Sequence, residues 1–96
     1  MHLTMGEIRN LLKDWHYYKA YITSSNSENE LIGKLNAIEK AVASLDEISR
    51  KAIELHYFKC ATIEITAAHV YMTVRGTYYR IASAIKKVAY LIENTA

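Results

Sequence analysis

Residues that break helices are almost absent from this sequence. The chain of 96 residues contains no proline and three glycines. Proline removes a backbone hydrogen-bond donor, and glycine in a helix interior costs roughly 1 kcal/mol relative to alanine, so most of this chain is free to form helices. About half of the residues (51%) are hydrophobic, which is enough to form a core. We therefore expect an all-α fold, and a single domain over residues 1–96 because so short a chain has no room for a second core.

Apolar side chains recur at spacings of three and four residues, the period of a helix that buries one face. This pattern predicts about five helices, of which the first spans about 5–21 and the last about 75–92. Helix starts are also marked by a Ser or Thr three residues before a Glu, the spacing of a capping box. Pairs with this spacing include Thr4–Glu7, Ser27–Glu30 and Ser44–Glu47, and we expect each of these three to start a helix.

The chain is expected to consist of two parts, a pair of helices in residues 1–43 and a short helix, tight turn and longer basic helix within residues 44–96. Apolar stripes in residues 8–22 and 31–42 offer more hydrophobic surface than a small three-helix core needs. A homo-oligomer built from the first two helices is therefore one expectation. The alternative is that the two stripes pack against each other.

Several classes of protein are excluded by what the sequence lacks. No apolar run approaches the roughly 18 residues of a membrane span, and the N-terminus has no apolar segment like that of a secretory signal. The four histidines include no pair at the i, i+4 spacing, so we expect no metal ion. No nucleophile, base and orienting group can be assembled from known motifs, so we expect neither an enzyme nor a cofactor. Cys60 is the only cysteine, which fits a reducing cytoplasm, and we expect it to be buried and structural.

Positive charge is concentrated in the C-terminal third of the chain. The formal net charge is only +2. Residues 59–92 nevertheless contain five basic side chains against the single acid Glu64, whereas residues 1–58 contain seven basic and eight acidic side chains. Such a distribution is expected of an element that faces phosphate groups.

The predicted last helix divides into an apolar and a basic face. The apolar stripe is expected to consist of Tyr78, Ile81, Ala82, Ile85, Val88 and Ala89. Arginine, lysine and hydroxyl-bearing side chains dominate the rest of the helix, and these groups suit the major groove of DNA. The candidate DNA-binding residues are Arg75, Thr77, Tyr79, Arg80, Ser83, Lys86 and Lys87. The alternative interpretation is a basic face that is merely solvated.

The position of each candidate along the helix indicates what it would contact. Arg80 lies near the helix start, and a bidentate contact from arginine to guanine is the commonest specific contact in the major groove. Lys86 and Lys87 lie further along, where phosphates are the expected targets. The hydroxyl-bearing candidates reach base edges or phosphates. The aromatic cluster in residues 15–18 is expected to form packing or a dimer surface rather than a stacking platform for single-stranded nucleic acid.

A distinctive pattern within residues 38–92 consists of Leu45, Glu47, Arg50, Ile53, Tyr57 and Phe58, followed by Thr77, Tyr78, Tyr79 and Arg80. With this pattern the segment resembles sigma-factor region 4, and more closely the small sigma-region-4-like phage regulators of the ArpU/RinA type. The run at residues 15–19 also resembles the opening helix of such regulators. The turn departs from the family pattern because no glycine occurs in residues 71–74. Two alanines, Ala67 and Ala68, are alternatives for the conventional small residue before that turn.

The resemblance implies a helix-turn-helix protein that binds specific DNA sequences and controls late phage genes such as those for packaging or lysis. Its partners would be double-stranded promoter or operator DNA and the host RNA polymerase, in the cytoplasm of a bacterial host. Two alternatives stay open. One is a small-terminase-like DNA packaging component, and the other is a helical protein-interaction module that antagonises a transcription factor.

Overall fold

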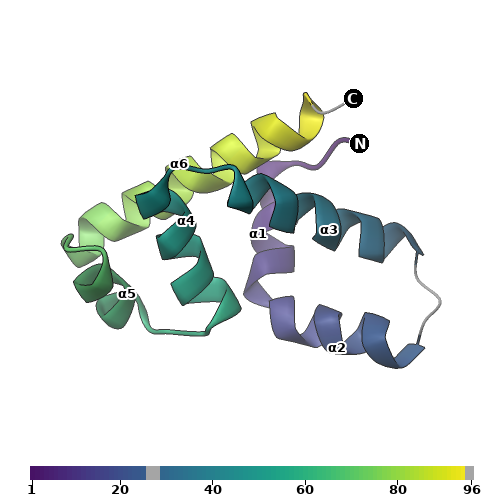
Figure 1. Ribbon diagram of the computed structural model, residues 1–96, viewed down its shortest axis with the longest axis horizontal. Coiled ribbons are helices and arrows are strands. Elements are labelled where there is room, and N and C mark those ends of the chain that lie inside the picture. Colours follow the sequence, from purple (N-terminus) through teal and green to yellow (C-terminus); the bar gives the residue numbers. More distant parts are fainter. Residues whose placement is uncertain (26–28, 95–96) are drawn as a thin grey trace.

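A computed structural model describes residues 1–25 and 29–94 of the chain, and all the regular structure in them is helical (Figure 1). This confirms the all-α expectation, with six α-helices in the described residues rather than about five. They are α1 (Met5–Lys13), α2 (Trp15–Ser25), α3 (Asn29–Ala43), α4 (Glu47–Ile53), α5 (Ile63–His69) and α6 (Val74–Glu93), with a π-helical turn, η1 (Glu54–Phe58), directly after α4. None of the helices in these ranges is long and apolar enough to cross a membrane.

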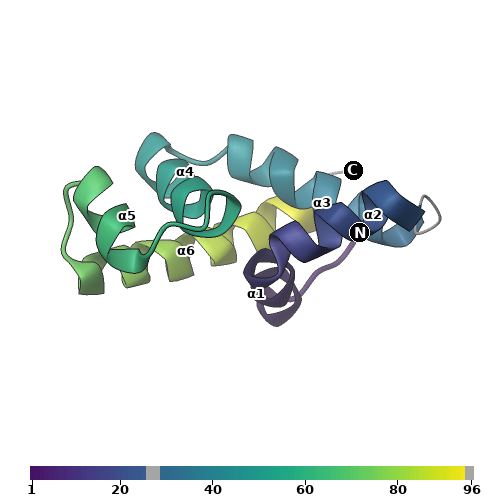
Figure 2. The ribbon, with the colours of Figure 1, turned by 90° about the horizontal axis from the view of Figure 1, so that it is seen from below.

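The long helix α6 is the element against which most others pack. It contacts α1, α3, α4 and α5, and it runs along most of the length of the molecule (Figure 1). Figure 2 shows α3 and α4 on one side of α6, whereas α1 lies at the opposite, lower edge of the view. The core is formed by fully buried aliphatic side chains from four helices, including Ile8, Leu12, Leu35, Ile38, Val42, Ile53, Ile85 and Val88.

The apolar stripes of the N-terminal helices are buried inside this one chain. Ile8 and Leu12 of α1 and Leu35 and Ile38 of α3 belong to the same core cluster as the inward face of α6. The surplus hydrophobic surface that motivated a homo-oligomer is therefore largely covered. The homo-oligomer stays a prediction, but surplus hydrophobic surface on the first two helices no longer supports it.

The first predicted helix is in fact two helices. Spacing alone indicated one helix over residues 5–21, but α1 ends at Lys13 and Asp14 caps it with a non-helical backbone (φ −110°, ψ 30°). The chain then turns sharply into α2 (Figure 1). The new direction places the Trp15 ring against Phe58 at a centroid distance of 4.7 Å. A long-range contact thus decides a break that no glycine or proline marks.

The side chains that cap the helices match the sequence predictions only in part. Thr4 and Glu7 form the predicted capping box at the start of α1. The Ser44–Glu47 prediction is wrong, because Asp46 caps α4 by accepting a hydrogen bond from the Ser49 amide (3.1 Å). Aspartate is at least as good an N-cap as serine, so the neighbouring acid takes the position. Ser27 lies outside the described residues, so the Ser27–Glu30 pair stays a prediction.

The turn η1 is wider than an α-helical turn. The Lys59 amide donates to the carbonyl of Glu54, five residues earlier (2.9 Å), which is the π-helical pattern. Nε2 of His16 donates to the Phe58 carbonyl (2.6 Å), so α2 also supports this turn.

Cys60 follows in the left-handed region (φ 57°) and is exposed. The prediction of a buried cysteine is therefore wrong, because the chain turns outward at this point.

The turn between α5 and α6 is closed by a Schellman motif. The Met72 amide donates to the Ala67 carbonyl (3.0 Å) and the Tyr71 amide to the Ala68 carbonyl (3.3 Å). Tyr71 occupies the left-handed position (φ 56°) that is usually glycine, and its side chain is 94% exposed. Ala67 is buried and Ala68 is exposed, so Ala67 is the small residue that packs before the turn.

We expect Tyr71→Gly to raise the free energy of unfolding by about 0.5–1 kcal/mol, because glycine adopts the left-handed conformation without a steric penalty. The tyrosine ring is exposed, so little packing is lost. Equilibrium urea unfolding measures the change. Tyr71→Ala is the matched control. It removes the ring but keeps the Cβ atom, so its free energy of unfolding should not rise. Equal stabilisation by both variants would show that the ring, and not the backbone, is the cause.

Candidate nucleic-acid interface

The inward face of α6 is rotated relative to the prediction. Its buried residues are Thr77, Ile81, Ala84, Ile85, Val88 and Ile92. Tyr78 (54% exposed) and Ala82 were expected in the core and instead lie on the surface. The predicted stripe was therefore correct at Ile81, Ile85 and Val88 and wrong at its edges.

Thr77 is the one DNA-binding candidate that the structure removes from the surface. Its side chain is fully buried, and its hydroxyl donates to the Thr73 carbonyl (2.8 Å). A threonine whose hydroxyl bonds to its own helix presents only its methyl group to the core, so it packs as valine does. Thr77 therefore cannot contact a ligand. Thr73 itself caps α6 by accepting from the Gly76 amide (2.9 Å).

Four of the remaining candidates share the exposed side of α6. We call Arg75, Tyr79, Ser83 and Lys86 the outer face; all four are exposed and follow one another at three- and four-residue spacings. A guanidinium nitrogen of Arg75 donates to the Tyr79 hydroxyl (3.4 Å), and its guanidinium carbon lies 5.8 Å from the centre of the ring. α6 contains no acidic residue before Glu93. The outer face therefore offers donors and positive charge with no competing carboxylate on its own helix.

Arg80 and Lys87 lie on one flank of α6, beside the start of α4. A guanidinium nitrogen of Arg80 is 3.8 Å from a carboxylate oxygen of Asp46, and the two side chains are 39% and 61% exposed, respectively. The two flank residues line a hollow of about 420 Å³ together with Ser83 and Ser49. Arg80 is thus held partly toward α4, whereas Arg75 extends from the outer face.

The carboxylate of Asp46 is stabilised in its charged form. Hydrogen bonds from the Ser49 amide and hydroxyl, and to a smaller extent the charge of Arg80, hold the pKa of Asp46 below its usual value. A carboxyl group whose pKa is lower in the folded than in the unfolded state stabilises the fold above its unfolded pKa. That contribution is lost as the pH falls through the folded pKa.

We therefore expect Asp46→Asn to lower the free energy of unfolding by about 0.3–1 kcal/mol at neutral pH, because asparagine still caps the helix but has no charge. The difference between the two proteins should shrink as the pH falls below about 3.9, the pKa of an unfolded aspartate, and then through the lower pKa of folded Asp46. Urea unfolding at a series of pH values measures it. A difference that stays constant down to strongly acidic pH would contradict this account of the charged cap.

The opposite flank of α6 contains basic residues that the sequence did not indicate. Arg9 and Lys13 of α1 line a hollow of about 350 Å³ with His56, Tyr57 and Tyr78. Burial raises the pKa of the Tyr57 hydroxyl, so it remains a hydrogen-bond donor at neutral pH. The two basic residues stand four apart on α1, in the part of the sequence where basic and acidic side chains nearly balance. Only the fold places them beside α6.

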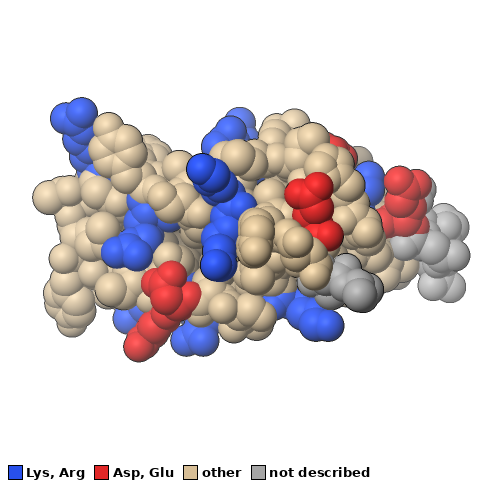
Figure 3. Space-filling view, turned by 90° about the horizontal axis from the view of Figure 1, so that it is seen from above, with Lys and Arg blue, Asp and Glu red and all other residues tan. Residues whose placement is uncertain are grey.

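The charges on the surface are distributed unevenly. Figure 3 shows a band of basic side chains across the middle of one face, whereas most of the acidic side chains visible there lie toward one end. In the described part of the chain, Arg75, Lys86 and Lys87 make no ion pair, and neither do Arg9 and Lys13. These five cations are therefore available to an anionic partner.

Other candidate sites are weaker. The Trp15 side chain is buried, so it cannot serve as a stacking platform for single-stranded nucleic acid. Within residues 1–25 and 29–94, no three His, Cys, Asp or Glu side chains are grouped to hold a metal ion.

No protein-family model, curated protein or solved structure matches this chain.

Proposed function

We propose that this chain is a sequence-specific DNA-binding transcription regulator in which α5, the turn and α6 act as a helix-turn-helix. The observation that supports this most directly is the outer face of α6, where Arg75, Tyr79, Ser83 and Lys86 are exposed together with no acid. Arginine and hydroxyl groups recognise base edges in the major groove, and lysine neutralises phosphate.

The connection between α5 and α6 supports the same proposal. Residues 70–73 join a helix of seven residues to one of 20 residues. Helix-turn-helix proteins join their two helices by a turn of three to four residues, and the second helix enters the major groove. Ala67, a small residue near the end of the first helix, is buried, and the two helices are in contact.

Finer parts of the proposal rest on the resemblance to sigma-region-4-like phage regulators. They are promoter or operator DNA of late phage genes as the target, host RNA polymerase as a second partner, and the bacterial cytoplasm as the location. Genome-wide mapping of bound DNA in the infected or lysogenic host tests them. Sites scattered without relation to promoters would reject the regulatory role.

DNA binding itself is tested with the wild-type protein and duplex DNA. The protein should enrich a preferred duplex from a random pool, and its affinity should fall with salt by a slope of about −0.9 per phosphate neutralised. A scrambled duplex of the same length is the control, and it should bind more weakly with a similar dependence on salt. Absence of salt-dependent binding to either duplex would reject the proposal.

A helical protein-interaction module is the second candidate, because four large aromatic side chains are exposed on and before α6: Tyr71, Tyr78, Tyr79 and Tyr90. Tyrosine is enriched at protein interfaces. The two functions differ in their dependence on salt. Failure of the duplex titration, together with binding to a protein partner that tolerates salt, would favour this second function.

A further inference from the structure

The hollow between α1, η1 and α6 is lined by two cations and two phenol groups on the flank of α6 opposite Arg80 and Lys87. From this geometry we propose that Arg9 and Lys13, with the hydroxyls of Tyr57 and Tyr78, form a seat for backbone phosphates of double-stranded DNA. The proposal rests on the DNA-binding function proposed above. It adds α1 as a second DNA-contacting element.

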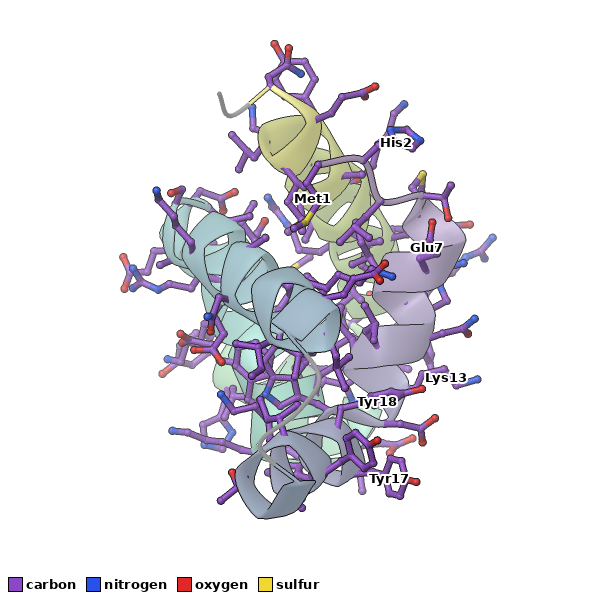
Figure 4. The ribbon with its side chains drawn as sticks, turned by 90° about the vertical axis from the view of Figure 1, so that its right-hand side faces the viewer. Met1, His2, Glu7, Lys13, Tyr17 and Tyr18 are labelled. Carbon is purple, nitrogen blue, oxygen red and sulfur yellow. The ribbon has the colours of Figure 1, made fainter. Side chains whose placement is uncertain are left out.

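The position of α1 relative to α6 fits this role. Figure 2 shows α1 projecting at the edge of the molecule along which α6 runs, away from α3 and α4. Lys13 extends from α1 away from α3 (Figure 4). The seat therefore flanks the exposed side of α6 and does not lie behind it.

The dimensions of the major groove explain why both flanks of α6 would matter. A helix with its side chains is about 10–12 Å across, and the groove is about 12 Å wide. A helix lying in the groove therefore has a phosphate backbone on each side. Arg80 and Lys87 would face one strand, and Arg9 and Lys13 would face the other.

The chemistry of the lining suits an anion such as phosphate rather than an apolar ligand. Phosphate oxygens accept hydrogen bonds, and Arg9, Lys13 and the two phenols are all donors. Neither cation is paired with an acid in the described residues. The acid of α1, Glu7, is occupied by its capping box with Thr4 and lies 4.0 Å from Lys34.

The test compares two double variants that lose the same charge. Arg9→Gln with Lys13→Gln alters the seat but keeps much of each side chain's length. Lys40→Gln with Lys51→Gln removes two exposed charges from α3 and α4, which pack on the inward side of α6. Each protein is titrated with the selected and the scrambled duplex at several salt concentrations, after circular dichroism has shown that it is folded.

The seat variant should bind both duplexes more weakly by about the same factor, and its slope of log K against log salt should be smaller by about two. The control variant should keep nearly the wild-type slope. Tyr78→Phe should weaken both duplexes by about two- to tenfold, whereas Tyr17→Phe on the exposed surface of α2 should not.

Two results would overturn the inference alone. In the first, the wild type binds DNA and the seat variant has the same slope of log K against log salt as the wild type. In the second, the seat and control variants lose the same amount of DNA affinity and of slope, which would mean that only the overall charge matters. Absence of DNA binding by the wild type would overturn the proposed function and the inference together.

Discussion

Replacing Trp15 with alanine should lower the free energy of unfolding by about 3–5 kcal/mol, the usual cost of removing a buried large aromatic side chain. The indole ring is 5% exposed and stacks on Phe58 at 4.7 Å, with an interplanar angle of 29°. Such aromatic pairs add about 0.5–1.5 kcal/mol to the burial of the rings themselves. The ring also holds the corner between α1 and α2 against η1.

Equilibrium urea unfolding followed by far-ultraviolet circular dichroism measures this change, because Trp15 is the only tryptophan and fluorescence is lost with it. Tyr17→Ala is the control, since this neighbouring aromatic side chain is 67% exposed. It should change stability by no more than about 0.5 kcal/mol. Similar losses in both variants would mean that the N-terminal helices are packed differently.

Replacing Arg75 with alanine should weaken binding to the selected duplex by about 1–3 kcal/mol and relax its preference at one base pair. Arg75 lies in the first turn of α6, the end of a recognition helix that contacts bases. Its contact with Tyr79 orders the guanidinium before DNA arrives, which reduces the entropy lost on binding.

Arg80→Ala is the matched control for Arg75→Ala, because it removes the same side chain from the flank of α6. Arg80 lies beside Asp46, so its loss should weaken the selected and scrambled duplexes about equally. Titrations of both variants with both duplexes separate the two roles. If only Arg80→Ala relaxed the sequence preference, the assignment made from the sequence would be correct and α6 would meet the groove with its flank.

The outline of the fold was predictable because helical periodicity and capping are local properties. Thr4 caps α1 as its spacing to Glu7 indicates. The break at Asp14 was not predictable, because it depends on Trp15 meeting Phe58, 43 residues later in the chain. Local spacing contains no information about such a contact.

The types of residue in the candidate site were predictable, but which side chains of α6 face the core and which face the solvent was not. Alanine gives no signal of burial, so Ala82 and Ala84 were indistinguishable, and only Ala84 is buried. Thr77 was placed with the polar residues because the hydroxyl bond to Thr73 cannot be inferred from residue type. Arg9 gives no signal in the sequence because basic and acidic side chains nearly balance in residues 1–58, and only the fold places α1 beside α6.

The π-helical turn η1 has a consequence for comparing this chain with related sequences. A hydrogen bond that spans five residues encloses one residue more than an α-helical turn does. Deleting one residue between 54 and 58 would restore α-helical geometry without shortening any connection on either side. Homologues should therefore differ here by single-residue gaps, and those that lack the residue should also lack the aromatic partner at position 15, because Phe58 would no longer face it.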